Sequence, residues 1–103
     1  MDTIYHVTTR SEWDGAMARG SYAAPSLQAE GFIHCSTAAQ VDGVLGRYFQ
    51  GKQDLVKLVI DPSKLAAALK YETAPSIGES FPHIYGEINI DAVTAVENIS
   101  PSR

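Results

Sequence analysis

The chain has 103 residues and a mass of 11.1 kDa, which is the size of one domain. Hydrophobic residues make up 45% and charged residues 19% of the sequence, a globular composition that argues against disorder. The net charge is −4 and the basic residues are scattered, so the sequence disfavours nucleic acid as a partner, since that binding needs a basic surface.

The single cysteine, Cys35, excludes an intrachain disulfide, a thiolate zinc site and a CxxC redox pair. The first residues show neither the basic nor the apolar segment of a signal peptide. No apolar run approaches the roughly 18 residues of a membrane helix. We therefore expect a single domain over residues 1–103, located in the cytoplasm and without membrane contact.

The first predicted elements are a strand and a helix. Residues 3–8 are rich in β-branched and aromatic side chains, which favour a strand. Ser11 is placed to cap a helix, with Asp14 as the acidic half of a capping box. Apolar residues at helical spacing follow, and Gly20 is placed to end the helix.

A second strand and helix are predicted after a loop over residues 21–30. The apolar run 31–36 indicates a short strand. Thr37 and Gln40 have the spacing of a capping box. Residues 41–49 keep a 3.6-residue apolar period, the strongest helix signal in the chain.

The second half of the chain is predicted to be richer in strands. Residues 55–60 are apolar on both faces, which suits a central strand. The other expectations are a helix beginning at Asp61-Pro62 and carrying Leu65, Ala66 and Leu69, a loop over 72–80, and strands over 83–90 and 93–99. These elements predict an α+β fold with a mixed, mostly antiparallel sheet and about three helices.

The three histidines are the most informative candidate functional residues, because each lies in a predicted strand or at its edge. Alternation along a strand places His6 on the same face as Thr8, and His34 on the same face as Ser36. In the last of these strands, the side chains on one face are His83, Tyr85, Glu87 and Asn89. Such a polar face borders either a cleft or bulk water.

Three other hypotheses for the function of these residues and their neighbours stay open. Zinc held by all three histidines lacks support from spacing, because no pair is H-x-H or H-x-x-x-H. Cys35 and His34 are strand neighbours on opposite faces, which disfavours a nucleophile–base pair. Ser36 and Thr37 lie where a strand becomes a helix, a place that favours an anion such as phosphate.

Three segments together resemble the domain-of-unknown-function 952 family of small bacterial proteins. They are Tyr-His-Val-Thr-Thr at 5–9, Gly-Phe-Ile-His-Cys-Ser-Thr at 31–37 and Phe-Pro-His-Ile-Tyr-Gly-Glu at 81–87. The segments 58–62 and 91–93 fit the same family. The resemblance covers nearly the whole chain, and it implies a family without implying a reaction.

The chain more distantly resembles the ADP-ribosyltransferase-like fold, including its RNA 2′-phosphotransferase branch. This resemblance implies that His6 with Thr8 holds the ribose of NAD. It implies that His34, with the hydroxyls of Ser36 and Thr37, borders the nicotinamide. The third catalytic position would be Glu87, or else His83 or Tyr85. An aromatic side chain such as Tyr85 or Tyr48 would stack on a ring of the nucleotide, and Arg10 would meet a phosphate.

Our leading hypothesis is that the domain binds NAD or a related nucleotide as substrate and transfers or hydrolyses ADP-ribose. A small phosphate-containing molecule is then its partner. The first alternative is a non-catalytic module that binds a small ligand or another protein. A weaker alternative is a metal-dependent hydrolase built on the histidines. No cofactor other than NAD as a substrate is implied, and the oligomeric state stays open.

Overall fold

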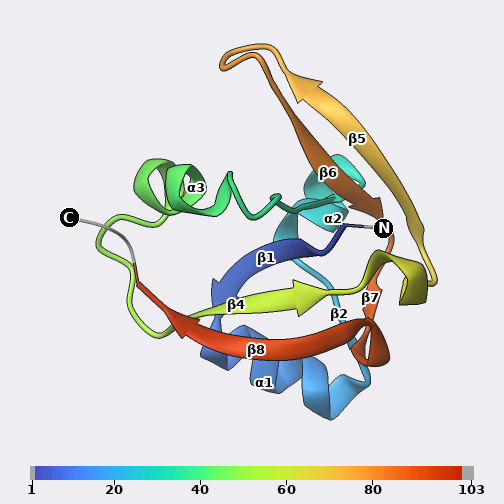
Figure 1. The fold of residues 1–103 in the computed structure, drawn as a ribbon. Coiled ribbons are helices and arrows are strands. Elements are labelled where there is room, and N and C mark those ends of the chain that lie inside the picture. The colour runs from blue at the N-terminus through green and yellow to red at the C-terminus, as the bar shows by residue number, and fades with distance from the viewer. Residues whose placement is uncertain (1, 101–103) are drawn as a thin grey trace.

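The structure is a computed structural model that describes residues 2–100. Within this range the chain forms a small α+β domain with antiparallel sheets and three α-helices, as the sequence predicted (Figure 1). In chain order the elements are β1 (Ile4–Thr9), α1 (Arg10–Arg19), β2 (Ser21–Tyr22), α2 (Pro25–Glu30), β3 (Ile33–His34), α3 (Val41–Tyr48), β4 (Leu55–Ile60), β5 (Ala68–Ala74), β6 (Glu79–Tyr85), β7 (Ile88–Asn89) and β8 (Val93–Ile99), with 3-10 turns at Pro62–Lys64 and Ile90–Ala92.

The strands form three sheets, in the orders β1-β4-β8, β2-β7 and β3-β6-β5. Strand β4 lies at the centre of the first sheet and pairs with a neighbour on each side. Its two-sided apolar sequence follows from this position, and the predicted strand over 55–60 is confirmed. The predicted strand over 93–99 is confirmed as β8.

Helix α1 begins at Arg10, two residues earlier than a cap at Ser11 would place its start. The side chain of Thr9 accepts a hydrogen bond from the Glu12 backbone N–H, so Thr9 is the cap. The helix ends at Gly20, as predicted, because its φ of 98° suits glycine and few other residues.

Two predictions about helices are wrong. The predicted loop 21–30 contains β2 and α2, and α2 begins at Pro25, whose fixed φ suits a first helical turn. The helix expected after Asp61 is only a 3-10 turn at Pro62–Lys64. Asp61 does cap this turn, but the chain from Ala68 onward pairs with β6 as strand β5 instead of continuing as a helix.

The prediction of one long strand over 83–90 is also wrong, because strand β6 ends at Tyr85 and a separate strand, β7, begins at Ile88. Strand β6 begins earlier, at Glu79, and forms a hairpin with β5 where a loop over 72–80 was expected. Strand β7 belongs to a different sheet. The predicted row of polar side chains therefore does not form one continuous face.

Within residues 2–100, one isolated β-bridge links β1 of the first sheet to the segment that follows β3 of the third sheet, and it positions the site. Tyr5 of β1 exchanges both backbone hydrogen bonds with Ser36, at 2.8 and 2.7 Å. One residue earlier, the N–H of Cys35 donates to the carbonyl of Pro82 in β6. The segment after β3 therefore joins β1 to β6, so that His6, His34 and His83 come from adjoining strands.

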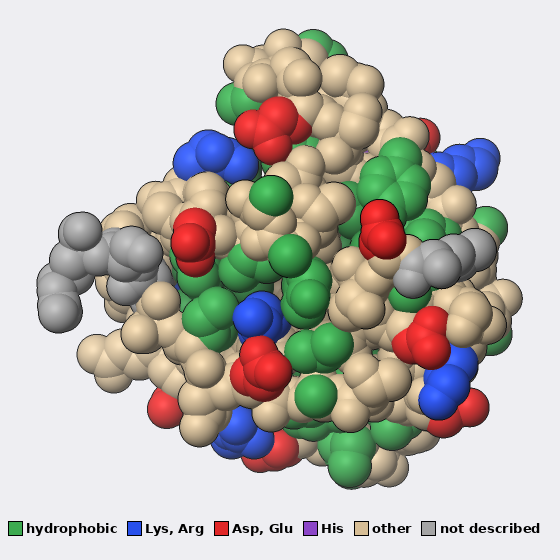
Figure 2. All heavy atoms as spheres, in the orientation of Figure 1, with side chains coloured by type: hydrophobic (Ala, Val, Ile, Leu, Met, Phe, Trp, Pro, Cys, Tyr) green, Lys and Arg blue, Asp and Glu red, His purple; other side chains and the backbone are tan. Residues whose placement is uncertain are grey.

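The core has two parts. The larger part packs Trp13 and Ala16 of α1 against buried side chains of β1, β4 and β6. The smaller part packs Val41 and Leu45 of α3 against Val7 of β1. Figure 2 shows the outer surface in the same orientation, where Lys and Arg side chains are separated from one another by acidic and apolar groups.

Candidate functional site

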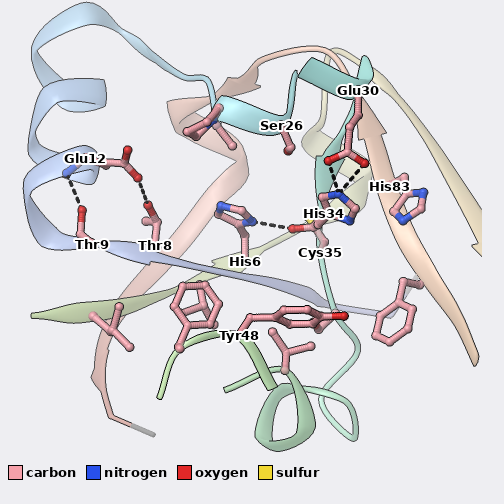
Figure 3. A pocket seen from close by; sticks show the side chains of 18 of the residues that line it. His6, Thr8, Thr9, Glu12, Ser26, Glu30, His34, Cys35, Tyr48 and His83 are labelled. Carbon is pink, nitrogen blue, oxygen red and sulfur yellow. Dashed lines mark hydrogen bonds and ion pairs between the residues drawn. The ribbon is translucent and has the colours of Figure 1, made fainter. Parts of the chain in front are cut away.

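A cavity of about 800 Å³ runs along the edge of β1 that faces away from β4 (Figure 3). Small-molecule sites commonly have this size. Strands β1 and β3, helices α2 and α3, and the tip of the β5–β6 hairpin contribute to its wall. Five of the residues that the sequence assigned to a nucleotide site line it: His6, Thr8, His34, Ser36 and His83. The structure thus brings together the three histidines and the two hydroxyls expected beside them.

His6 is held by two protein partners. Its Nδ1 lies 2.6 Å from the carbonyl oxygen of His34, and its Nε2 lies 2.8 Å from the hydroxyl of Tyr22. Burial lowers the pKa of His6 to about 4, so the ring is neutral at pH 7. Because a carbonyl only accepts, Nδ1 carries the proton and Nε2 accepts from Tyr22. Neither ring nitrogen is left for a ligand, so His6 fixes β1 against β3 and β2.

The contact between His6 and Tyr22 extends into a series of polar contacts that reaches the cavity wall. The hydroxyl oxygens of Tyr22 and Thr8 are 3.0 Å apart, and Thr8 donates to Oε1 of Glu12 at 2.8 Å. Burial raises the pKa of Tyr22 to about 12, so this hydroxyl keeps its proton. Four polar groups from β1, β2 and α1 are therefore connected, and Glu12 brings a carboxylate to the cavity.

His34 and His83 are direct cross-strand neighbours in the β3–β6 pair. Their ring centroids are 5.2 Å apart, and the ring of Phe32 lies beside both of them. Residues opposite each other on antiparallel strands approach closely, which explains why these two imidazoles meet.

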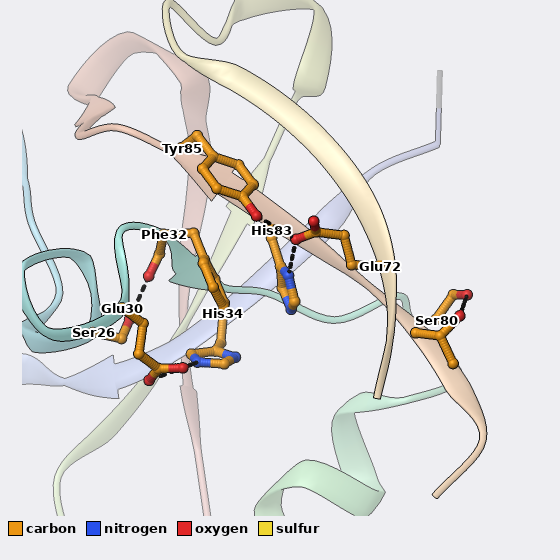
Figure 4. Close-up of polar contacts among 9 residues, drawn as sticks. Ser26, Glu30, Phe32, His34, Glu72, Ser80, His83 and Tyr85 are labelled. Carbon is orange, nitrogen blue, oxygen red and sulfur yellow. Dashed lines mark hydrogen bonds and ion pairs between the residues drawn. The ribbon is translucent and has the colours of Figure 1, made fainter. Parts of the chain in front are cut away.

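Each of these histidines has its own glutamate partner. Nε2 of His34 lies 3.2 Å from both carboxylate oxygens of Glu30. Nδ1 of His83 lies 2.6 Å from Oε1 of Glu72, which also accepts from the hydroxyl of Tyr85 (Figure 4). These hydrogen bonds lower the pKa of Glu72, so it is a carboxylate at neutral pH.

The comparisons with known proteins agree with this fold. The profile of the family described as "Protein of unknown function (DUF952)" matches residues 7–96. The chain belongs to this family. A crystal structure of protein CC0527 from Caulobacter crescentus is 33% identical, with a TM-score of 0.85, and the match covers 93% of this chain and 84% of that one. A solution NMR structure of CC0527 gives 33% identity and a TM-score of 0.82, covering 97% and 86%.

A comparison with curated proteins gives no significant match. Within residues 2–100, no helix of this DUF952 domain is long and apolar enough to cross a membrane.

Four residues that the sequence analysis placed at the site lie outside the cavity wall of this DUF952 domain. Arg10 donates to Asn98 of β8 at 2.6 Å, and Glu87 accepts from Ser21 of β2. The Thr37 N–H donates to the side chain of Gln40, so it is not free for an anion. Tyr85 points to Glu72 beside the cavity.

Sequence reasoning missed several residues that build the site. The side chains of Glu12 and Glu30 lie four residues from Thr8 and His34, but each pair joins a strand to a helix, so helical spacing gave no signal for these contacts. Tyr22 and Glu72 gave no local signal, because both were assigned to loops.

The described residues contain no ligand set for the metal ion that the alternative of a metal-dependent hydrolase requires. No group of three or more His, Cys, Asp or Glu side chains within residues 2–100 is arranged to hold a metal ion. Both ring nitrogens of His6 have protein partners, which removes one of the three histidines from such a site.

The alternative of a cysteine nucleophile is also disfavoured. Cys35 touches the cavity, but its side chain is almost wholly buried. Burial raises the pKa of this thiol, so it is protonated at neutral pH and lacks the reactive thiolate.

Proposed function

We propose that the cavity binds NAD or a closely related nucleotide and that the domain cleaves its nicotinamide–ribose bond, transferring ADP-ribose to water or another acceptor. The convergence of Thr8, His34 and Ser36 on one cavity, beside a His6 ring whose two nitrogens bind protein partners, carries the proposal. The resemblance to the ADP-ribosyltransferase-like fold, which assigns these residues to NAD, is part of the proposal.

The edge of β1 that faces away from β4 supports a place for the nicotinamide. In antiparallel strands, alternate residues turn their N–H and C=O groups to opposite edges. Tyr5 turns both groups toward Ser36, so those of Val7 point the same way, and Val7 lines the cavity. A carboxamide such as that of nicotinamide needs one donor and one acceptor, which the backbone of Val7 supplies.

Two side chains of the outer wall suit the rest of a dinucleotide. Tyr48 of α3 is 64% exposed and lines the cavity, where its ring can stack on a base. Lys52 lines the same region with a flexible positive charge, which suits a diphosphate.

The carboxylates of the wall suit the bond cleavage. Breaking the nicotinamide–ribose bond builds positive charge on the ribose, and fixed negative groups nearby stabilise that charge. Glu12 and Glu30 both line the cavity, and the Thr8 hydroxyl holds the carboxylate of Glu12 in place.

Isothermal titration calorimetry with NAD, ADP-ribose and nicotinamide tests the binding. We expect one NAD per chain and at least about fivefold weaker binding in His34→Ala, which removes an exposed ring without opening the core. The matched control is Tyr71→Ala, which removes an exposed strand ring outside the cavity and should bind NAD as the wild type does. Absence of binding by the wild type at millimolar NAD and ADP-ribose would overturn the proposal.

A non-catalytic ligand-binding module is the second candidate function. It is favoured by the engagement of both His6 nitrogens and by the position of Glu87 outside the cavity, which leave fewer groups for chemistry. Chromatography of the bound ligand separates the two functions. An enzyme releases free nicotinamide from NAD over hours, whereas a binding module returns NAD unchanged.

A further inference from the structure

We propose that His83 is the general base of the cavity and that Glu72 is the residue that positions it. This inference rests on the proposed function, because it names the group that activates the water or acceptor hydroxyl. It comes from a contact across the β5–β6 hairpin that local sequence patterns did not show.

The hydrogen bond between the two residues determines which ring nitrogen of His83 is free. Nδ1 lies 2.6 Å from the Glu72 carboxylate, and a carboxylate only accepts, so Nδ1 carries the proton. In the neutral ring the lone pair is then on Nε2. Within the described residues Nε2 has no protein partner, and His83 lines the cavity. A free lone pair on a ring that lines a cavity is what a general base requires.

The surroundings hold this ring rigidly. Phe32 stacks on His83 with ring centroids 4.1 Å apart and an angle of 20° between the planes. Tyr85 donates to the same oxygen of Glu72, at 2.6 Å, and so fixes the carboxylate (Figure 4). The side chain of His83 is only 12% exposed, whereas that of Glu72 is 39% exposed, so the imidazole is the inner member of the pair.

The hairpin register explains how the pair forms. His83 lies opposite Lys70, and Glu72 lies opposite Phe81, so Glu72 is the diagonal neighbour of His83 on the same face. The other charged or titratable groups near His83 are His34 across the β3–β6 pair with its partner Glu30, and Lys70, whose Nζ lies over the Tyr85 ring.

The proton transfer balances for hydrolysis of NAD. Nε2 of His83 takes a proton from water while the water oxygen bonds to C1′ of the ribose. The bond from C1′ to the nicotinamide nitrogen breaks, and its electron pair leaves with nicotinamide. The products are ADP-ribose, neutral nicotinamide and a proton on His83, which then passes to solvent. In a transfer reaction, the hydroxyl of an acceptor takes the place of water.

The test compares nicotinamide release and NAD binding in His83→Gln, Glu72→Gln and the matched control Glu79→Gln. Glu79 lies on the same hairpin, outside the cavity wall, and its substitution removes the same charge. General-base catalysis contributes about 100- to 10,000-fold, so His83→Gln should lower kcat at least about 100-fold with KM nearly unchanged. Glu72→Gln should lower kcat about tenfold or more and alter the pH profile of kcat, and Glu79→Gln should do neither.

A second measurement needs no ligand. Long-range ¹H–¹⁵N NMR should show the Nδ1–H tautomer of neutral His83 in the wild type and in Glu79→Gln, and a loss of that preference in Glu72→Gln.

The outcomes separate the two proposals. Equal nicotinamide release by wild type and His83→Gln, or an Nε2–H tautomer of His83, would overturn the role of His83 and leave the proposed function standing. Binding of NAD without nicotinamide release would overturn both the role of His83 and the cleavage in the proposed function, in favour of the binding module. Failure of the wild type to bind NAD would overturn the proposed function itself.

Discussion

Nε2 of His6 lies 2.8 Å from the hydroxyl oxygen of Tyr22, and this buried contact joins the edge of the first sheet to the small β2–β7 sheet. One hydroxyl proton cannot serve both neighbours of Tyr22. With His6 neutral, Tyr22 donates to His6 while Thr8 donates to Glu12. With His6 protonated, Nε2 of His6 donates to Tyr22, Tyr22 donates to Thr8, and Thr8 donates to Glu12.

The first prediction is that Tyr22→Phe destabilises the fold. The substitution leaves Nε2 of His6 buried without a hydrogen-bond partner, which costs about 1–3 kcal/mol. For a domain of this size the loss corresponds to a decrease in Tm of at least about 4 °C. Denaturant unfolding at pH 7 measures it. Tyr71→Phe removes a hydroxyl from an exposed ring and should change the unfolding free energy by less than about 0.5 kcal/mol. Equal effects of the two substitutions would contradict the role of the Tyr22 hydroxyl.

The second prediction is that His6 makes stability depend on pH between about 6.5 and 4. The folded-state pKa of about 4 lies below the value of 6.5 for a free histidine. The unfolded chain therefore binds a proton in this range that the folded chain does not. The stabilisation by neutral His6 is complete above pH 6.5 and is lost as the pH falls toward 4, by about 3 kcal/mol in total.

NMR titration of the His6 ring checks this directly, because the carbon-bound ring protons report the charge. We expect a midpoint near pH 4 in the folded protein. A midpoint near 6.5 would show that the ring is not buried as the structure has it. The slope of unfolding free energy against pH should also be smaller in His6→Gln than in the wild type.

The sequence correctly predicted the strand whose residues are apolar on both faces and the helix whose apolar residues recur at helical spacing. Strand β4 is apolar throughout because it lies between two other strands. Helix α3 has its buried Val41 and Leu45 on one stripe. The two His-x-hydroxyl pairs were also found from alternation, because β1 is a regular strand and His34 is followed by a bridge at Ser36.

Pairing between distant segments was not predictable in the same way. The leucine spacing at Leu65 and Leu69 suits a helix, but the hydrogen bonds that β6 offers to Ala68–Ala74 make that segment a strand. Glu72 therefore meets His83 only through a hairpin register that no local pattern specifies. The short strands β2 and β7 have two residues each, too few for any periodicity.

The third prediction concerns Gly86, at the break between β6 and β7. A Cβ at this position would lie 2.7 Å from the Cβ of Ala67, which is too close for two carbon atoms. Gly86→Ala should destabilise the fold by about 1–3 kcal/mol, as overpacking does. Adding Ala67→Gly to the same chain should recover part of this loss. In contrast, Gly46→Ala meets nothing within 4 Å in helix α3 and should stabilise by about 0.5–1 kcal/mol. Denaturant unfolding that gives the same sign at both glycines would refute the close contact.

The fourth prediction is that Cys35 is unreactive in the folded protein. Burial raises the pKa of the thiol, and its 3% exposure blocks access to reagents. Alkylation by iodoacetamide, followed by mass spectrometry, should be at least about tenfold slower in the folded chain than in the denatured chain. Rapid alkylation of the folded protein would restore the nucleophile reading of Cys35.

The fifth prediction distinguishes Lys52 from Arg10 as the partner of a phosphate. Arg10 was the candidate from the sequence, but it binds Asn98 away from the cavity, whereas Lys52 lines the cavity wall. Lys52→Ala and Arg10→Ala remove the same charge, so their comparison separates local contact from net charge. An exposed ion pair contributes up to about 1 kcal/mol, so Lys52→Ala should weaken NAD binding about two- to fivefold, and added salt should reduce the difference. Arg10→Ala should leave the dissociation constant unchanged in the same calorimetric titration. If Arg10→Ala weakened NAD binding and Lys52→Ala did not, the phosphate site would lie on the α1–β8 side of the first sheet. Arg10 would then be the phosphate partner, as the sequence suggested.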